Sequence, residues 1–301
     1  MALLAVAAYL AVQYVAGGAG APGCKVASGK GGRTTYEFTP EQAVNAATIT
    51  AVGTARQLPE RAVTIALAAA LQESTLRNLD YGDKDSLGLF QQRPSQGWGK
   101  PEEIMDPAYS AGLFYDHLVE VPGYLDLPLT DAAQRVQRSA FPYAYAKHEP
   151  DAELLAAALT GRSAATLTCE GRPGPTPQKG PDAVRAALVR DFGHAVLEPA
   201  GAEVADGTGA TRSAGASDER TVTVPVTGGT GAGGERETGR RGWQVAHWAV
   251  ANASSLHIQR VTYAGREWTA GNTDSKWYPT STRGTKGAER AAGPVRITSS
   301  W

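Results

Sequence analysis

The sequence predicts a mainly α-helical domain followed by a small α+β domain, with a disordered linker between them. Within residues 40–170, apolar side chains recur at the spacing of helix faces, and proline or a capping residue precedes several of the repeats. Residues 198–240 are rich in glycine, threonine, serine and glutamate, which is typical of a flexible linker. Residues 241–301 combine one apolar helical segment with short alternating segments that are typical of strands.

Composition limits the functions that the chain can have. It has 301 residues, enough for two modest domains, and its formal net charge of -1 argues against nucleic acid as a partner. The 35 glycines and 18 prolines gather near the N-terminus and between about Gly171 and Gly242. We therefore expect linkers in these two regions and the globular mass between them.

The N-terminal segment is almost wholly apolar from Ala2 to Ala16 and then becomes rich in glycine. This segment is shorter than the ~20 residues that span a bilayer, and no basic residues precede it. Residues 1–23 are therefore predicted to be either a signal peptide or a membrane anchor, with acylation of Cys24 as a third interpretation. Both predictions place the protein outside the cytoplasm, in the cell envelope, either anchored or secreted. Residues 24–39 are expected to be a linker.

Only two cysteines occur, Cys24 and Cys169. An even pair in an exported chain predicts one disulfide, which would tie the start of the exported chain to the end of the helical domain. The alternative is two unreactive thiols in a cytosolic protein, which the predicted export disfavours. The five histidines show no ligand spacing with the cysteines or with one another, so we predict no metal site and no cofactor.

The helices of the first domain follow recognisable start signals. Pro40 and Glu41 open a first helix that runs to about Ala55, and a second helix follows Pro59 as far as Glu73. Later segments carry apolar residues at helical spacing after a capping residue or a proline. Helices are accordingly expected over residues 106–119, 130–139, 151–159 and 181–192.

The rest of the chain predicts a smaller structure. Residues 171–197 contain a Pro/Gly-rich segment and the last of these helices. Beyond the linker, residues 243–252 form an apolar helix, and residues 256–268 alternate like a strand pair with its turn at Ala264-Gly265. Residues 295–298 can add a final strand. No catalytic residue is assigned to this small α+β domain.

Glu73 is the first candidate for a catalytic residue. At about 100° per residue, it projects on the same helix stripe as the alanines at positions 62, 66, 69 and 70. Burial of that stripe would disfavour the ionised carboxylate and raise the pKa of Glu73, which suits a general acid. The alternative is a helix-end glutamate whose side chain points into water.

An acidic loop follows over residues 78–86, and it contains Asp80, Asp83 and Asp85. Oxygen ligands at short spacing suit calcium, but no glutamate closes a twelve-residue calcium-binding loop here. A solvated acidic turn is therefore the favoured interpretation. The same three aspartates are the candidates for a second catalytic carboxylate.

A polar loop over residues 91–99 contains Gln91, Gln92 and Trp98. Proteins hold sugars by hydrogen bonds from amides and by stacking on aromatic rings, so these three side chains are candidate substrate contacts. Packing of Trp98 into the core is an equally good interpretation.

Two short motifs carry a resemblance to a known superfamily. Glu73-Ser74 and, after the acidic loop, Gly88-Leu89-Phe90-Gln91 resemble the Glu-Ser and Gly-Leu-(Met/Phe)-Gln motifs of soluble lytic transglycosylases and goose-type lysozymes. The resemblance covers about residues 40–160. It implies a lysozyme-like domain in which Glu73 is the catalytic acid and the segment from Gly88 to Gln91 lines the sugar-binding cleft. Residues 71–148 also resemble an uncharacterised actinobacterial group of secreted proteins.

The chain departs from the superfamily at one position. Its members usually carry Ala-Tyr-Asn downstream, whereas the nearest matches in this chain are Ala144-Tyr145-Ala146 or Ser139-Ala140-Phe141, neither with asparagine. In the first match, Tyr145 would take the tyrosine role without the asparagine. The resemblance implies cleavage of the β-1,4 glycan strands of peptidoglycan, with Ser74, Gln91 and Tyr145 orienting substrate or acid.

The same resemblance implies that Glu73 protonates the glycosidic oxygen and then accepts the proton of the sugar's own 6-hydroxyl, so that cleavage is not hydrolytic. The rival hypothesis is a non-catalytic wall-binding or scaffolding protein that keeps the cleft. A transport or metal-handling function is disfavoured because one short apolar segment cannot form a path across a membrane.

Overall fold

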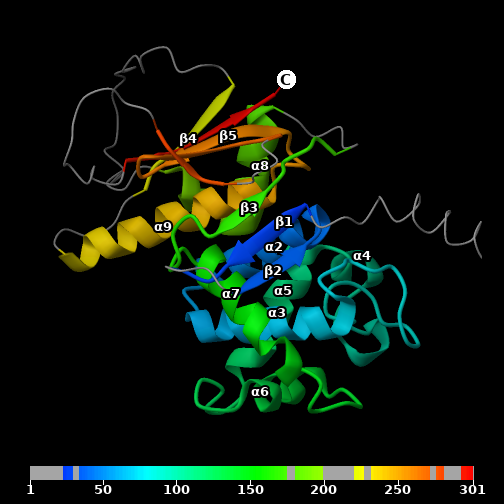
Figure 1. Cartoon of the computed structure of the whole chain (residues 1–301). Coiled ribbons are helices and arrows are strands. Elements are labelled where there is room, and N and C mark those ends of the chain that lie inside the picture. Colours follow the sequence, from blue (N-terminus) through cyan, green and yellow to red (C-terminus); the bar gives the residue numbers. More distant parts are fainter. Residues whose placement is uncertain are drawn as a thin grey trace, which may run out of the picture.

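The computed structural model describes residues 23–29, 34–174, 180–198, 220–226, 232–271, 276–280 and 293–300. Helices form most of the molecule, and two small antiparallel sheets complete it (Figure 1). The predicted combination of helices with a smaller strand-containing part is therefore confirmed. The predicted signal peptide or anchor lies outside the described residues, apart from Gly23. Among the described helices, none is long and apolar enough to cross a bilayer.

The predicted helices form with bounds close to those expected, except that the last one, predicted over residues 243–252, begins at Ala232, and α4 is an additional helix that the sequence did not predict. Thr39 caps the first one, with its hydroxyl accepting from the backbone N–H of Gln42 while the Gln42 amide oxygen accepts from the backbone N–H of Thr39. The described helices are α2 (Pro40–Ala55), α3 (Glu60–Ser74), α4 (Pro101–Ile104), α5 (Pro107–Val119), α6 (Leu129–Gln137), α7 (Glu149–Leu159), α8 (Pro181–Phe192) and α9 (Ala232–Ala251).

Helix α3 lies at the centre of the helical part and carries Glu73 near its C-terminal end. Every residue from Ala62 to Leu71 is buried, so the whole circumference of this segment is covered and not only one stripe. Its neighbours are α2, α5, α6 and α7. The run of alanines keeps the helix narrow, which allows these neighbours to approach closely and fixes the position of its end.

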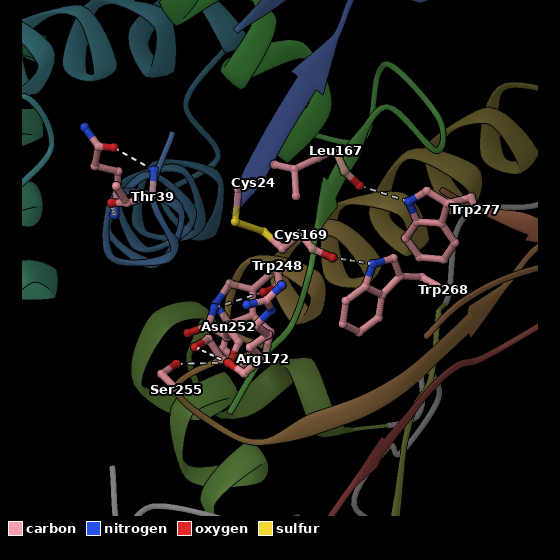
Figure 2. The surroundings of a disulfide bond; sticks show 12 residues. Cys24, Thr39, Leu167, Cys169, Arg172, Trp248, Asn252, Ser255, Trp268 and Trp277 are labelled. Atoms are coloured by element: carbon pink, nitrogen blue, oxygen red, sulfur yellow. Dashed lines mark hydrogen bonds between the residues drawn. A yellow bond between two sulfur atoms is a disulfide. The ribbon is translucent and has the colours of Figure 1, made fainter. Parts of the chain in front are cut away.

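The segment predicted as a linker over residues 24–39 is instead part of a sheet. It contains β1 (Cys24–Ala27) and β2 (Thr35–Phe38), and β1 also pairs with β3 (Leu167–Cys169) on its other side. The prediction failed because these strands are four residues or fewer and because β1 takes its second partner, β3, from a distant part of the chain. The register places Cys24 directly opposite Cys169, and the predicted disulfide between them is confirmed (Figure 2).

A five-stranded antiparallel sheet covers the end of the molecule that lies away from α6 (Figure 1). The predicted strand pair is confirmed as a hairpin, with Ala264 and Gly265 at positive φ as the tight turn requires, and the predicted final strand is confirmed as well. The spatial order is β4-β8-β5-β6-β7. The strands are β4 (Thr221–Val224), β5 (Ile258–Tyr263), β6 (Arg266–Thr269), β7 (Tyr278–Pro279) and β8 (Val295–Ser299).

Part of the expected linker over residues 198–240 is regular structure. Strand β4 and the first turns of α9 lie within it, while residues 199–219 and 227–231 lie outside the described part. Helix α9 packs between the five-stranded sheet and helices α2 and α7, as Figure 1 shows. One continuous set of buried side chains therefore joins the two predicted domains.

Polar contacts reinforce this joint. The buried carboxylate of Asp191 on α8 accepts hydrogen bonds from Thr48 on α2 at 3.1 Å and from the indole of Trp248 on α9 at 2.7 Å. The indoles of Trp268 and Trp277 donate to the backbone carbonyls of Cys169 and Leu167, which fastens β3 to the C-terminal half (Figure 2). Because these donors and acceptors are buried, separating the halves would leave them unpaired.

Candidate active site

The end of α3 places Glu73 at a fixed position. Thr75 and Leu76 follow in the left-handed conformation and stop the helix. Their carbonyls accept hydrogen bonds at 2.8 Å from the side-chain amides of Gln42 and Asn45 on α2. These bonds satisfy backbone groups that a helix end leaves open, so the position of Glu73 is determined by α2 as well as by α3.

The carboxyl group of Glu73 is half-buried and has two hydrogen-bonding neighbours. The hydroxyl of Tyr145 donates to its Oε1 at 2.7 Å, and the side-chain amide of Gln137, the last residue of α6, also bonds to it. Burial raises the pKa of Glu73 above its ordinary value, while the two hydrogen bonds oppose that effect. The direction agrees with the sequence prediction of a carboxyl group that keeps its proton more readily than one in water.

Tyr145 lies behind Glu73 and is fully buried. Burial and the neighbouring carboxylate of Glu73 both raise the pKa of the Tyr145 phenol well above its usual range. Tyr145 therefore stays neutral at and around neutral pH and acts as a hydrogen-bond donor to Glu73.

Ser74 points into the core and not into solvent. Its Oγ lies 2.8 Å from the carbonyl of Leu89 and 3.1 Å from the carbonyl of Ala70. The hydroxyl thus ties the segment Leu89–Gln91 to the end of α3. This geometry gives Ser74 a positioning role, which places the second motif beside Glu73.

The Gly88-Leu89-Phe90-Gln91 motif forms a tight turn. Gly88 has φ +76°, and a Cβ atom there would lie 2.8 Å from the backbone carbonyl oxygen of Ile104. The side-chain amide of Gln91 folds back and donates to the carbonyls of Tyr81 and Gly88 at 3.3 Å. Only glycine meets both the conformation and the space at position 88.

Gln92 has a different role from its neighbour. Its side chain is only 2% exposed, and its amide donates to the carbonyl of Ser110 on α5 at 3.1 Å. Gln92 therefore fastens the loop to α5, and its donor is already occupied, whereas Gln91 remains half-exposed at the cleft wall.

An open cleft of about 830 Å³ lies against Glu73. Three segments form its walls: the loop over residues 83–98, the end of α5 with the residues after it, and the end of α6 with the residues that follow. Trp98 lines one side, where its ring packs against the His117 ring at 4.5 Å. Phe141 lines the other side and is 71% exposed. The cleft thus has aromatic rings and charged side chains within reach of one carboxyl group.

The structure separates the three aspartates of the acidic loop. Asp83 lines the cleft, whereas Asp80 and Asp85 are not part of its lining. Hydrogen bonds from Ser95 and from Arg93, whose Nε lies 2.7 Å away, lower the pKa of Asp85 well below its usual range. Asp85 is therefore engaged in holding the loop. Among the described residues, no group of three acidic, histidine or cysteine side chains is placed to hold a metal ion.

Five of the residues that the sequence suggested as site candidates line the cleft, namely Glu73, Asp83, Gln91, Gln92 and Trp98, whereas Gln137 and Phe141 line it without having been suggested. Gln137 touches Glu73 because α6 packs across α3, and its amide also donates to the Phe90 carbonyl at 2.8 Å. A glutamine at the end of a short helix carries no sequence signal of this contact. An exposed phenylalanine next to Pro142 was the one available hint for the opposite wall.

The comparisons with known proteins concern the other end of the molecule. The C-terminal part is similar to the family described as VldE, C-terminal domain, whose model matches residues 222–290. That stretch contains α9 and strands β5, β6 and β7, and it includes none of the cleft residues. No curated protein matches the chain. The chemistry of the cleft has to be inferred from its own geometry.

Proposed function

We propose that this protein is an exported enzyme with a lysozyme-like domain, which cleaves the β-1,4 glycan strands of peptidoglycan and uses Glu73 as its catalytic acid. The observation that carries the proposal is the half-buried Glu73 carboxyl at the wall of an open cleft, with its pKa raised by burial. A general acid needs its proton at the pH at which it works, and burial shifts the pKa of Glu73 in the direction that favours this.

The walls of the cleft suit a glycan with peptide side chains. The rings of Trp98 and Phe141 offer faces for sugar stacking, and Gln91 and Glu73 belong to the same lining. The lining also contains Lys84, Arg93, Arg135 and Arg138. Their positive charges would attract the carboxylates that peptidoglycan carries on its lactyl and peptide groups.

The proposed reaction needs one carboxyl group. Glu73 gives its proton to the glycosidic oxygen as the bond from that oxygen to the sugar C1 breaks. The resulting carboxylate then accepts the proton of the same sugar's 6-hydroxyl, whose oxygen forms the new bond to C1. The product ends in 1,6-anhydromuramic acid, and Glu73 regains its proton. A hydrolase would need a second carboxylate to activate water, and of the three loop candidates only Asp83 lines the cleft.

Two features support export. The disulfide between Cys24 and Cys169 is the kind of cross-link that persists in oxidising compartments outside the cytoplasm. The apolar segment from Ala2 to Ala16 matches the apolar region of a signal peptide or an anchor. Both agree with a substrate in the cell wall.

Glu73→Gln tests the proposal, because the amide keeps the shape of the side chain and cannot supply a proton. The full chain is incubated with purified peptidoglycan, and soluble fragments are identified by mass spectrometry. We expect product formation to fall by at least a hundredfold in this variant. Asp80→Asn, on the same loop but outside the cleft lining, should keep the wild-type rate. Wild-type turnover by Glu73→Gln would refute the assignment.

Digestion in heavy-oxygen water distinguishes the two routes of cleavage. The transglycosylase route leaves no label in the products, because the 6-hydroxyl replaces water. Label in new reducing ends, together with loss of activity in Asp83→Asn, would show a hydrolase instead.

One observation favours the rival hypothesis of a non-catalytic wall-binding protein. Ala146 follows Tyr145 where the resembling enzymes carry asparagine, so one polar contact to substrate is missing. On this hypothesis the wild type and Glu73→Gln bind peptidoglycan equally well in a sedimentation assay, and neither releases fragments.

A further inference from the structure

A second hollow, of about 810 Å³, lies far from the Glu73 cleft, on the outer face of the five-stranded sheet. Strands β4, β5, β6 and β8 form its floor, and the segment Gly171–Pro173 forms part of its rim. The opposite face of the same sheet packs against α9. This outer face therefore carries side chains that the core does not need.

Strand alternation explains which side chains point outward. Val222, Val261 and Ile297 are buried on the face that packs against α8 and α9, while alternate residues on the same strands line the hollow. At an irregularity in the pairing of β5 with β8, between Ile258 and Arg260, two consecutive residues of β5, Gln259 and Arg260, are exposed and line the hollow. We call this surface the arginine–threonine face; its arginines and threonines are Arg172, Arg220, Thr221, Arg260, Thr262, Thr269, Arg296 and Thr298.

The face concentrates positive charge in a protein whose net charge is -1. Four arginines line the hollow, against Glu267 as the one acidic side chain among the described lining residues. The residues opposite Arg296 are threonines on both sides, Thr223 and Thr262. Arg260 likewise lies between Thr269 and Thr298, and its Nε is 3.7 Å from Glu267.

The register also makes Arg260 and Arg296 diagonal neighbours on adjacent strands. Diagonal neighbours are about 7–8 Å apart, within reach of long side chains, and like charges at such positions repel. A bound anion would remove this repulsion. The pairs of arginine and threonine are repeated along the strands, which suits a ligand with several regularly spaced negative charges better than a single ion.

We propose that the arginine–threonine face binds a linear phosphodiester polymer. Guanidinium groups bind phosphate oxygens through two parallel hydrogen bonds, and threonine hydroxyls donate to the same oxygens. Among the described residues that line the hollow, His257 has the only aromatic ring, so the hollow offers few surfaces on which nucleic-acid bases could stack. The lining also lacks the large exposed apolar side chains that insert into a bilayer. The proposal does not depend on catalysis by Glu73.

The test is a binding titration with the full chain, using a fluorescent poly(glycerol phosphate) oligomer as the probe and anisotropy as the readout. We expect saturable binding that weakens steeply as the salt concentration rises, because bound counterions are released. The double variant Arg260→Glu/Arg296→Glu should lose at least tenfold in affinity. Arg266→Glu is the matched control: it is exposed on the same hairpin but outside the hollow, and should bind like the wild type.

Three further probes decide the class of ligand. Poly-glutamate, a single-stranded oligonucleotide and vesicles of phosphatidylglycerol should each bind at least tenfold more weakly than the poly(glycerol phosphate) oligomer. Equal or tighter binding of any of them would overturn the proposal. Failure of the poly(glycerol phosphate) oligomer to bind would do the same, as would an equal loss of affinity in Arg266→Glu. Circular dichroism of each variant checks that the sheet is intact. Glu73→Gln should keep full binding, which separates this result from the test of the proposed function.

Discussion

At the scale of single residues, the hydrogen bond from Tyr145 to Glu73 connects the fold to the proposed chemistry. Burial raises the pKa of the Glu73 carboxyl, and Tyr145 limits that rise because its hydroxyl stabilises the ionised form. The helical pattern predicted the burial of Glu73. The contact with Tyr145 was predicted only through the resemblance, because 72 residues separate the two in the chain.

Tyr145→Phe should therefore raise the pKa of Glu73 further. An acid with a higher pKa keeps its proton to higher pH, so the alkaline limb of the pH–activity profile of glycan cleavage should move upward. Tyr143→Phe is the control, because Tyr143 is 79% exposed and near in sequence, and its profile should match the wild type. An unchanged profile in Tyr145→Phe would show that this hydrogen bond does not lower the pKa of Glu73.

His247 on α9 is a second residue with a shifted proton equilibrium. It is completely buried, its Nδ1 donates to the Ala158 carbonyl at 2.7 Å, and burial lowers its pKa from 6.5 to about 4. The unfolded chain takes up a proton below pH 6.5 and the folded chain only below about pH 4. His247 thus favours folding fully above pH 6.5, and this contribution is lost as the pH falls toward 4.

At about 1.4 kcal/mol per pH unit, the free energy of unfolding should drop by up to about 3 kcal/mol over that interval through His247 alone. Urea unfolding at pH 7.5 and pH 4.5 measures the change. In His247→Gln the pH dependence should shrink, whereas His194→Gln, at an exposed position, should behave like the wild type. Equal pH dependence in all three proteins would contradict the assignment.

At the scale of elements, the sequence predicted helices well and short strands poorly. Helices α2 to α8, apart from the short α4, have apolar positions, prolines and caps within the segment itself. Strands β1 and β2 contain four residues each, and β1 takes its second partner, β3, from more than 100 residues away. The turn that begins at Gly88 was predicted only in part. The sequence shows its glycine, but it does not show that this glycine packs against Ile104 at the end of α4.

Gly88→Ala should test that turn. The added methyl group combines left-handed strain with a clash against the Ile104 carbonyl, so the protein should lose roughly 2–3 kcal/mol of stability. Gly97→Ala also has positive φ, but nothing lies within 4 Å of the added atom, and roughly 1 kcal/mol is expected. Chemical denaturation compares the two. Equal losses would show that the contact with α4 contributes nothing.

At the scale of the whole molecule, one core replaces the two domains that the sequence predicted. Strand β4 and the first turns of α9 lie within residues 198–240, which the composition predicted to be a linker, and composition says nothing of whether the flanking parts touch. Helix α9 contacts both parts, and the buried Asp191 joins α8 to α2 and α9. The cleft is therefore supported from a distance by the C-terminal half.

The disulfide acts on the same scale. It closes a loop of 145 residues, for which chain entropy gives a stabilisation of about 5 kcal/mol at most. Cys24→Ser/Cys169→Ser should lower the free energy of unfolding by about 2–5 kcal/mol, as measured by denaturant titration. Reductant should destabilise the wild type by a similar amount and leave the variant unaffected. Alkylation of both thiols in unreduced native protein would rule out the bond.

The strand orders have a consequence for how the chain acquires its structure during synthesis. Strand β1, the first described strand, lies between β2 and β3 in the smaller sheet. Strand β8, the last described strand, lies between β4 and β5 in the larger sheet. The larger sheet cannot close until residue 299 has emerged from the ribosome, or from a secretion channel. A growing chain would thus leave β4 and one edge of β5 unpaired until β8 has emerged, which is a condition that favours passage across a membrane before folding.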